Sequence, residues 1–327
     1  METLIINNYH FTPSNFAVTT KTHSVSHFHL KQVLQIRQLS NCIRNQVTPT
    51  KMAAADASSG HLQQIPGVNQ QRIIIENKHG EKLMGVLHET GSTDIVILCH
   101  GFQSSKESST VMTLASALEK EGISAFRFDF AGNGESEGSF QYGNYRREAD
   151  DLRSVVQYFH GENRVTSAIL GHSKGGNVVL LYASKYHDVH RVINVSGRYK
   201  TEGGVEERLG TGYLQRVKKD GFIDVKSKSG EVSYRVTEES LMDRLNTNMH
   251  EACLQIDKDC KVLTVHGSND EVVRVEEALG FAKIISNHKL HIIEGANHRY
   301  SEHRDELTSI VLSFIKEPHS SYNQDNV

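Results

Sequence analysis

The sequence predicts an α/β fold: a mostly parallel central sheet with helices on both faces and a further segment inserted late in the chain. Short β-rich runs alternate with helical patterns from about residue 70 to residue 317, and this order implies βαβ crossovers. Some runs, such as DIVILC at 94–99, are continuously apolar, which is typical of strands buried on both faces. No proline occurs between Pro66 and Pro318, so the regular structure is not interrupted.

The expected elements follow a regular order up to residue 197. Two strands separated by the turn NKHG open the series as a hairpin. A buried strand follows, and helices and strands then alternate according to their periods of 3.6 and two residues. The expected strands cover residues 70–76, 81–89, 94–101, 123–130, 165–173 and 191–197, and the expected helices cover residues 109–122, 145–161 and 175–187.

An interruption at about residues 199–256 is too long for a plain connection. It contains a helical pattern at 205–222 and an alternating pair at 223–236, which predicts a hairpin about Ser229–Gly230. We expect a cap subdomain that shapes a substrate pocket, and a surface insertion without a functional role is the alternative. The regular order then resumes, with strands expected at 261–270 and 288–298 and helices at 275–286 and 302–317.

The first 65 residues differ in composition from the domain expected at 66–317. Among the first fifty residues only Glu2 is acidic, and Ser, Thr, Asn and His are abundant. This composition predicts a disordered leader that acts as a transit peptide to the chloroplast or another organelle. The alternatives are an unstructured leader without an address and a cytoplasmic form that starts at Met52. Residues 318–327 are expected to form a flexible tail.

Composition excludes several classes of protein. The chain has 327 residues, 23% of them charged, and a net charge of −3, and this balance provides no basic surface for nucleic acid. No apolar run approaches the ~18 residues that span a bilayer, so no integral membrane segment is predicted. The four cysteines are scattered, and no metal-binding or cofactor-binding motif occurs. We therefore expect no cofactor, no metal site and a small-molecule substrate.

Residues 171–175, GHSKG, form a G-x-S-x-G pattern between an expected strand and an expected helix. A turn this sharp needs small neighbours, and it projects the Ser173 hydroxyl from the top of the sheet. The helix that begins there directs its first N–H groups and its dipole at the same point. The pattern predicts Ser173 as a nucleophile, and an ordinary serine in a glycine-rich loop is the alternative.

A serine nucleophile needs a base and an acid at neighbouring strand ends. His298 follows the last expected strand and precedes the terminal helix, whereas His303 lies in that helix and is the weaker candidate. Asp270 follows the strand before it, where its carboxylate would accept the Nδ1 proton of the base. An N-cap role is the plain alternative for Asp270, and Glu271 is the fallback acid.

An oxyanion hole needs two backbone N–H donors beside the nucleophile. Lys174 supplies one of them, because its N–H is among the first of the helix after Ser173. The loop after the strand at 94–101 supplies the other from Phe102, and Gly101 before it allows the backbone to approach the substrate closely.

Five motifs carry a resemblance to a known family: HGF at 100–102, FDFAGNGESEG at 128–138, GHSKGG at 171–176, HGSND at 266–270 and GANH at 295–298. With these motifs, the segment from about 70 to 317 resembles the α/β-hydrolase superfamily, and is most similar to its cap-bearing serine esterases. These include cinnamoyl and feruloyl esterases and monoacylglycerol-lipase-like enzymes. The resemblance implies hydrolysis of a carboxylic ester through an acyl-enzyme. It assigns Ser173 as nucleophile, His298 as base, Asp270 as acid, and the N–H groups of Phe102 and Lys174 as oxyanion donors.

Two positions depart from the pattern of the relatives. Lys174 stands where many of them have Gln or Met, so its ammonium either tunes the field beside the nucleophile or points into solvent. Val272 and Val273 stand where relatives often carry proline after the acid. Neither departure removes a member of the triad. Thioesterase, peptidase or acyltransferase chemistry would use the same triad, and a non-catalytic ligand-binding relative is a further alternative.

Overall fold

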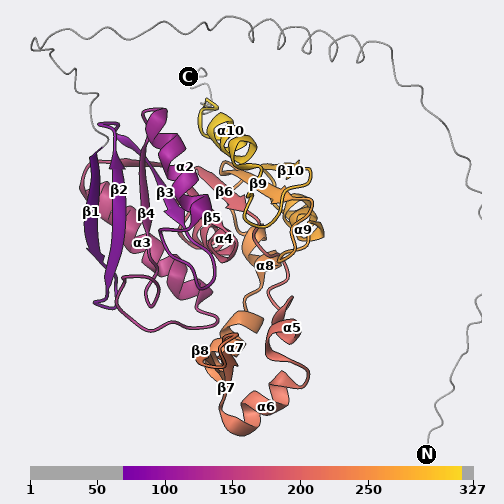
Figure 1. Cartoon of the computed structure of the whole chain (residues 1–327). Helices are drawn as coiled ribbons and strands as arrows, with labels where there is room; N and C mark the ends of the chain where they lie inside the picture. Colours follow the sequence, from indigo (N-terminus) through magenta and orange to yellow (C-terminus); the bar gives the residue numbers. More distant parts are fainter. Residues whose placement is uncertain (1–68, 319–327) are drawn as a thin grey trace, which may run out of the picture. The chain divides into compact units, whose positions relative to one another are not determined.

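The computed structural model describes residues 69–318, so the predicted leader, the alternative start at Met52 and the tail after Pro318 lie outside the described residues. Eight strands form one sheet in the order β1-β2-β4-β3-β5-β6-β9-β10 (Figure 1). These strands are β1 (Asn69–Glu76), β2 (Lys82–Glu89), β3 (Asp94–Cys99), β4 (Ser124–Phe128), β5 (Val165–His172), β6 (Arg191–Val195), β9 (Lys261–Gly267) and β10 (His288–Ile293).

Strand pairing confirms the α/β class and the leading hairpin. Strands β1 and β2 pair antiparallel in full register, and β2 also runs antiparallel to β4. All later neighbours in the sheet are parallel. Because β3, β5, β6, β9 and β10 run in one direction, their carboxyl ends meet at the same edge, where α/β sheets bind their ligands.

Helices cover both faces of the sheet, and β3 shows how the sequence separates the two cores. Ile95, Ile97 and Cys99 belong to the core under one set of helices, whereas Val96 and Leu98 belong to the core under the other set. The first set is α3 (Tyr145–Gly161), α4 (Lys174–Tyr186), α8 (Met249–Leu254) and α9 (Glu276–Ile284), and the second is α2 (Ser109–Lys120) and α10 (Arg304–Ile315). No helix within residues 69–318 has the length and apolar character needed to cross a membrane.

The insertion (residues 199–256) lies between β6 and β9 and carries its own small core. The predicted hairpin is present, but the single helical pattern expected at 205–222 is two helices. Gly210 and Gly212 separate them with φ angles of 80° and 69°, which L side chains rarely adopt. The elements of the insertion, which lie together below the sheet in Figure 1, are α5 (Val205–Leu209), α6 (Tyr213–Asp220), β7 (Phe222–Lys226), β8 (Val232–Thr237) and α7 (Glu238–Leu245), followed by α8.

The small core of the insertion includes residues from loops at the carboxyl edge of the sheet. Tyr142, in the segment before α3, is buried in that core, and Phe102, in the loop after β3, packs against it. The Phe102 ring lies 5.7 Å from the ring of Tyr234 on β8. The insertion therefore contacts the same loop from which an oxyanion donor is expected.

A buried ion pair joins the loop after β3 to the loop after β4. The Asp129 carboxylate accepts hydrogen bonds from the backbone N–H of Lys106 at 2.6 Å and of Glu135 at 3.0 Å. The Lys106 ammonium pairs with Asp129 at 2.6 Å and with Glu135 at 2.5 Å. Since Lys106 and Asp129 are both buried, this network fixes how the two loops approach the edge of the sheet.

Candidate active site

Ser173 occupies a strained turn between β5 and α4. Its φ of 56° and ψ of −120° lie outside the regions that non-glycine residues normally adopt. A Cβ at Gly171 would collide with the backbone of Gly175, and one at Gly175 would collide with the backbone after β3. The glycines on both sides of the serine are therefore required by close packing, as the G-x-S-x-G pattern predicts.

The structure brings Ser173, His298 and Asp270 into one hydrogen-bonded row, although 125 residues separate the serine from the histidine. His298 Nδ1 lies 2.7 Å from Asp270 Oδ2, and His298 Nε2 lies 3.0 Å from Ser173 Oγ. Because an ionised carboxylate can only accept, Nδ1 carries the proton and Nε2 is left to accept from the serine hydroxyl. This is the geometry that a general base and its orienting acid require.

Asp270 is held in its ionised form by three hydrogen-bond donors and by the nearby ring of His266, whose Nε2 also donates to the Val273 carbonyl at 2.8 Å. Its Oδ1 accepts from the backbone N–H groups of Val272 at 2.9 Å and Val273 at 2.7 Å. Its Oδ2 faces His298 and also His266 Nε2, which lies at 3.3 Å. Burial alone would raise the pKa of Asp270, but the hydrogen bonds from His266 and His298 hold that pKa well below its ordinary value. Proline has no N–H to donate, so a proline at Val272 or at Val273 would remove one of these bonds.

The alternative acid, Glu271, and the alternative base, His303, both lie outside the hydrogen-bonded row. Glu271 Oε2 accepts from the backbone N–H of His298 at 3.2 Å, so it supports the loop and does not contact the imidazole in the triad. His303 is the N-cap of α10 and is absent from the row. His172 donates from Nε2 to the carbonyl of His298 at 2.8 Å, and burial lowers the pKa of His172 to about 4. These contacts fix the backbone that carries the base.

His100 orients the peptide that supplies the predicted oxyanion donor. Its Nε2 accepts from the Phe130 N–H at 3.1 Å, so its Nδ1 carries the proton and donates to the Gly101 carbonyl at 2.8 Å. Burial lowers the pKa of His100 to about 4, which keeps this ring neutral. Because the peptide is trans, the N–H of Phe102 points to the side opposite the carbonyl that His100 holds.

The two expected oxyanion donors lie beside the nucleophile. A Cβ at Gly101 would lie 3.0 Å from the Cβ of Ser173 and 3.6 Å from its Oγ. Within residues 69–318, the N–H of Phe102 donates no backbone hydrogen bond. Lys174 is the first residue of α4, so its N–H has no intrahelical partner. Both groups are therefore available to a substrate oxygen.

The Lys174 side chain is buried, so the alternative that its ammonium points into solvent is wrong. Its ammonium pairs with Glu148 on α3 at 2.6 Å and lies 5.0 Å from the centre of the Tyr145 ring. Lys174 and Glu148 are 5% and 3% exposed. Burial raises the pKa of Glu148 to about 7, although the charge of Lys174 opposes this rise.

Sequence reasoning missed Glu148, but the sequence contained a signal for it. The buried face of α3 includes Tyr145, Glu148 and Leu152, which are spaced as neighbours along one side of a helix. A carboxylate on such an apolar stripe needs a buried partner. The partner, Lys174, lies one residue after the nucleophile. The roles of His100, His172 and His266 were also missed, because hydrogen bonds between loops leave no periodic pattern.

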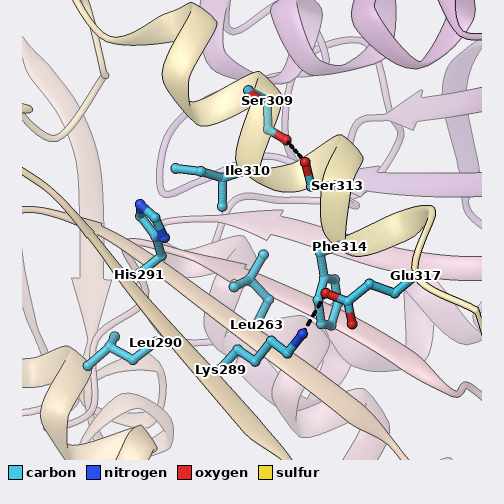
Figure 2. Close-up of a pocket in the computed structure, with 9 residues that line it drawn as sticks. All are labelled: Leu263, Lys289, Leu290, His291, Ser309, Ile310, Ser313, Phe314 and Glu317. Carbon is cyan, nitrogen blue, oxygen red and sulfur yellow. Dashed lines mark hydrogen bonds and ion pairs between the residues drawn. The ribbon is translucent and has the colours of Figure 1, made fainter. Parts of the chain in front are cut away.

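A surface pocket elsewhere on the domain lacks the features of an active site. It has a volume of about 470 Å³ and lies between β9, β10 and α10 (Figure 2). Figure 2 shows Lys289 paired with Glu317 at its edge, at 2.5 Å. None of the triad residues lines it. A second hollow, of about 540 Å³, lies beside Phe102 and is lined by Gln103, Phe140 and Tyr234 among others.

The site contains no arrangement for a metal ion. Within the described part of the chain, no group of three or more His, Cys, Asp or Glu side chains is placed to hold one.

Comparison with known proteins identifies the family. A family model described as serine aminopeptidase, S33, matches residues 91–303, which contain the serine, the histidine and the aspartate of the row. The chain therefore belongs to this family of α/β-hydrolases.

Solved structures and a curated relative agree with the fold. A structure titled as ferulic acid bound to Est1E from Butyrivibrio proteoclasticus is 24% identical, covers 74% of this chain and 97% of its own, and has a TM-score of 0.65. The Pyrococcus furiosus esterase PF2001 is 20% identical, covers 82% of this chain and 98% of its own, and has a TM-score of 0.59. An uncharacterised protein of Saccharomyces cerevisiae is 25% identical over 63% of this chain and 68% of its own length.

The raised pKa of Glu148 predicts a specific pH dependence of stability. Below a pH of about 4.5 the carboxyl is protonated in both states, but between that pH and about 7 the folded protein retains a proton that the unfolded chain has lost. Stability from this group is therefore present at low pH and is lost as pH rises through that window. Glu148→Gln should reduce the fall in unfolding free energy between pH 5 and pH 8 by an amount on the order of 3 kcal/mol.

Urea unfolding at a series of pH values measures this change, with Glu137→Gln, which removes an exposed carboxylate, as the matched control. The control should follow the wild-type pH profile. If Glu148→Gln follows it too, the buried carboxyl does not titrate in this window.

Proposed function

We propose that this protein hydrolyses carboxylic esters through an acyl-enzyme formed on Ser173. The observation that carries the proposal is the unbroken row from Ser173 Oγ to His298 Nε2 at 3.0 Å and from His298 Nδ1 to Asp270 Oδ2 at 2.7 Å. Ser173 lies on a strained turn that holds its hydroxyl at the carboxyl edge of the sheet. Strain of this kind is found where a nucleophile must be presented to a substrate.

In the first half of the proposed reaction, Ser173 Oγ attacks the carbonyl carbon and its proton moves to His298 Nε2. Asp270 stabilises the imidazolium that forms, and it keeps the ring in the required tautomer. The carbonyl oxygen becomes negative and accepts from the N–H groups of Phe102 and Lys174. When the intermediate collapses, the bond to the alcohol oxygen breaks and His298 returns the proton to it.

In the second half, water attacks the acyl-enzyme by the same route. His298 takes one proton from the water, the oxygen adds to the acyl carbon, and the proton then goes to Ser173 Oγ as the acid is released. The insertion packs against the Phe102 loop, so we infer that it acts as a cap that shapes the substrate pocket. An amide, a thioester or an acceptor alcohol would enter the same steps, and substrate panels separate these activities.

Replacement of the nucleophile is the first test. Ser173→Ala should lower kcat for 4-nitrophenyl butyrate by a factor of roughly 10⁵ or more, because among residues 69–318 no other hydroxyl is hydrogen-bonded to His298 Nε2. Labelling by a fluorophosphonate probe should be lost in the same variant. Ser301→Ala, which removes an exposed serine, is the control and should retain both signals. Substantial turnover or labelling in Ser173→Ala would exclude the proposed nucleophile and leave a binding role for the fold.

The neighbouring carboxylates provide a second test. Asp270→Asn should lower kcat about 10⁴-fold, because an amide at this position favours the wrong tautomer of His298. Glu271→Gln should reduce activity only a few-fold, since Glu271 contacts the backbone N–H of His298 and not its ring. Steady-state kinetics with circular dichroism as a folding check measures both variants. A larger loss in Glu271→Gln than in Asp270→Asn would mean that the acid is wrongly assigned.

A further inference from the structure

Three arginine side chains converge beside the loop of the oxyanion donor. Arg198 follows β6, Arg208 lies on α5 and Arg244 lies on α7. The Arg208 guanidinium lies 4.5 Å from the centre of the Phe102 ring, and the Arg244 guanidinium lies 5.0 Å from the centre of the Tyr142 ring. The rings of Phe102 and Tyr142 are themselves 5.6 Å apart. Residues far apart in the sequence thus place three positive charges in one region.

Two of these charges are close enough to repel each other. Arg244 Nη2 donates to the carbonyl of Gly203 at 3.2 Å, and a Cβ on Gly203 would lie 2.6 Å from Arg198 Nη1. Burial and the charge of Arg244 lower the pKa of Arg198. Two guanidinium groups that repel each other in this way need a counter-charge nearby or a functional reason.

The described residues provide no carboxylate partner for this cluster. Arg198 donates to the carbonyl of Val272 at 2.5 Å, and Arg244 donates to the Tyr145 hydroxyl at 3.1 Å. Within residues 69–318, no salt bridge involves Arg198, Arg208 or Arg244, whereas Arg235 in the same insertion pairs with Asp224 at 2.7 Å. The charge of Glu277 favours a higher pKa of Arg198, but the Glu277 carboxylate lies beyond salt-bridge distance from it.

Two buried polar atoms beside the cluster also lack partners. Arg244 is 7% exposed, yet its Nε has no hydrogen-bond partner among the described residues, and neither has the hydroxyl of the fully buried Tyr142. A buried donor without an acceptor is unfavourable, because its desolvation is not compensated by a hydrogen bond. Arg208, in contrast, is exposed and can be reached from solvent. The region therefore offers several donors and an entry point, and the described residues pair none of its guanidinium groups with a carboxylate.

Two contact paths connect the cluster to the nucleophile. On one side, Arg208 lies on the ring of Phe102, whose preceding glycine packs on Ser173. On the other side, Arg244 contacts Tyr145, whose ring lies under the ammonium of Lys174. The arginine cluster thus packs against side chains that lie next to Ser173 and Lys174.

We propose that Arg208, Arg198 and Arg244 bind an anionic oxygen group, a carboxylate or a phosphate, at the far end of the ester that Ser173 cleaves. The proposal rests on the ester hydrolysis proposed above and specifies its substrate class. Guanidinium groups match both anions in geometry and charge. The same cluster repels the protonated amine that a substrate of an aminopeptidase would bring to this region, so the charge favours an anionic ester within the family.

Matched esters test the proposal in the full chain. The mono-4-nitrophenyl ester of adipic acid carries a carboxylate, and 4-nitrophenyl hexanoate is its neutral counterpart of equal acyl length. 4-Nitrophenyl 6-phosphooxyhexanoate distinguishes phosphate from carboxylate. We expect the wild type to have a kcat/KM at least about tenfold higher for one of the anionic esters than for the neutral ester. Arg208→Gln should lower that preference about tenfold, whereas Lys219→Gln, which removes an exposed cation of the insertion, should leave it unchanged.

Binding measured without turnover separates this proposal from the proposed function. The dissociation constants of the Ser173→Ala variant for the same esters should favour the anionic ester, and Arg208→Gln in that background should remove the difference. Equal dissociation constants, or a preference that survives Arg208→Gln, would overturn the anionic site even if the esters are hydrolysed. An anionic preference in binding without any turnover dependent on Ser173 would retain the anionic site and refute the ester hydrolase.

Discussion

The backbone conformation of Ser173 is the constraint on which the rest of the site depends. A non-glycine residue at φ 56° and ψ −120° costs on the order of 1–3 kcal/mol. Two hydrogen bonds hold it there: the Ser173 N–H donates to the Val195 carbonyl at 2.7 Å, and the Gly176 N–H donates to the Ser173 carbonyl at 2.9 Å. Strand β5 lies between β3 and β6 in the sheet, and most of α4 is buried. The turn between them therefore has no room to relax, and the Ser173 hydroxyl stays at the edge of the sheet.

The ionisable groups buried around this turn differ in protonation state, and burial and hydrogen-bond partners decide each state. Burial keeps His100 and His172 neutral near pH 7, so each donates one hydrogen bond and holds a loop. Asp270 stays ionised because three donors bond to it and the His266 ring lies beside it. The pair of Lys174 and Glu148 is the costliest of these features, because two ionisable groups are removed from water one residue after the nucleophile. These contacts fix the loops and the carboxylate that surround the row of Ser173, His298 and Asp270.

The sequence predicted the sheet, the helices and the candidate triad because each depends on local patterns. Apolar runs mark β3 and β5, and their carboxyl ends fall at one edge by topology. This is why His298 and Asp270 could be matched with Ser173 across more than ninety residues. The insertion was harder to predict, since Gly210 and Gly212 end one helix and begin another within an otherwise continuous helical pattern.

Contacts between distant loops could not be predicted from these patterns. The edge-to-face contact of Phe102 with Tyr234, and the hydrogen bond from Arg244 to Tyr145, join segments that have no shared period. The orientation of the Lys174 side chain could not be predicted either, because its partner on α3, Glu148, is 26 residues away in sequence. Electrostatic properties of the candidate site therefore required the three-dimensional arrangement.

The most direct test of the central claim is to locate the acyl group during turnover. The protein is mixed with 4-nitrophenyl acetate, quenched in acid before the substrate is exhausted, and digested for peptide mapping by mass spectrometry. If Ser173 is the nucleophile, one acetyl group per chain should be found on Ser173, formed as the first equivalent of nitrophenolate is released. An acetyl group on another side chain, or steady turnover with Ser173 unmodified at every quench time, would contradict it.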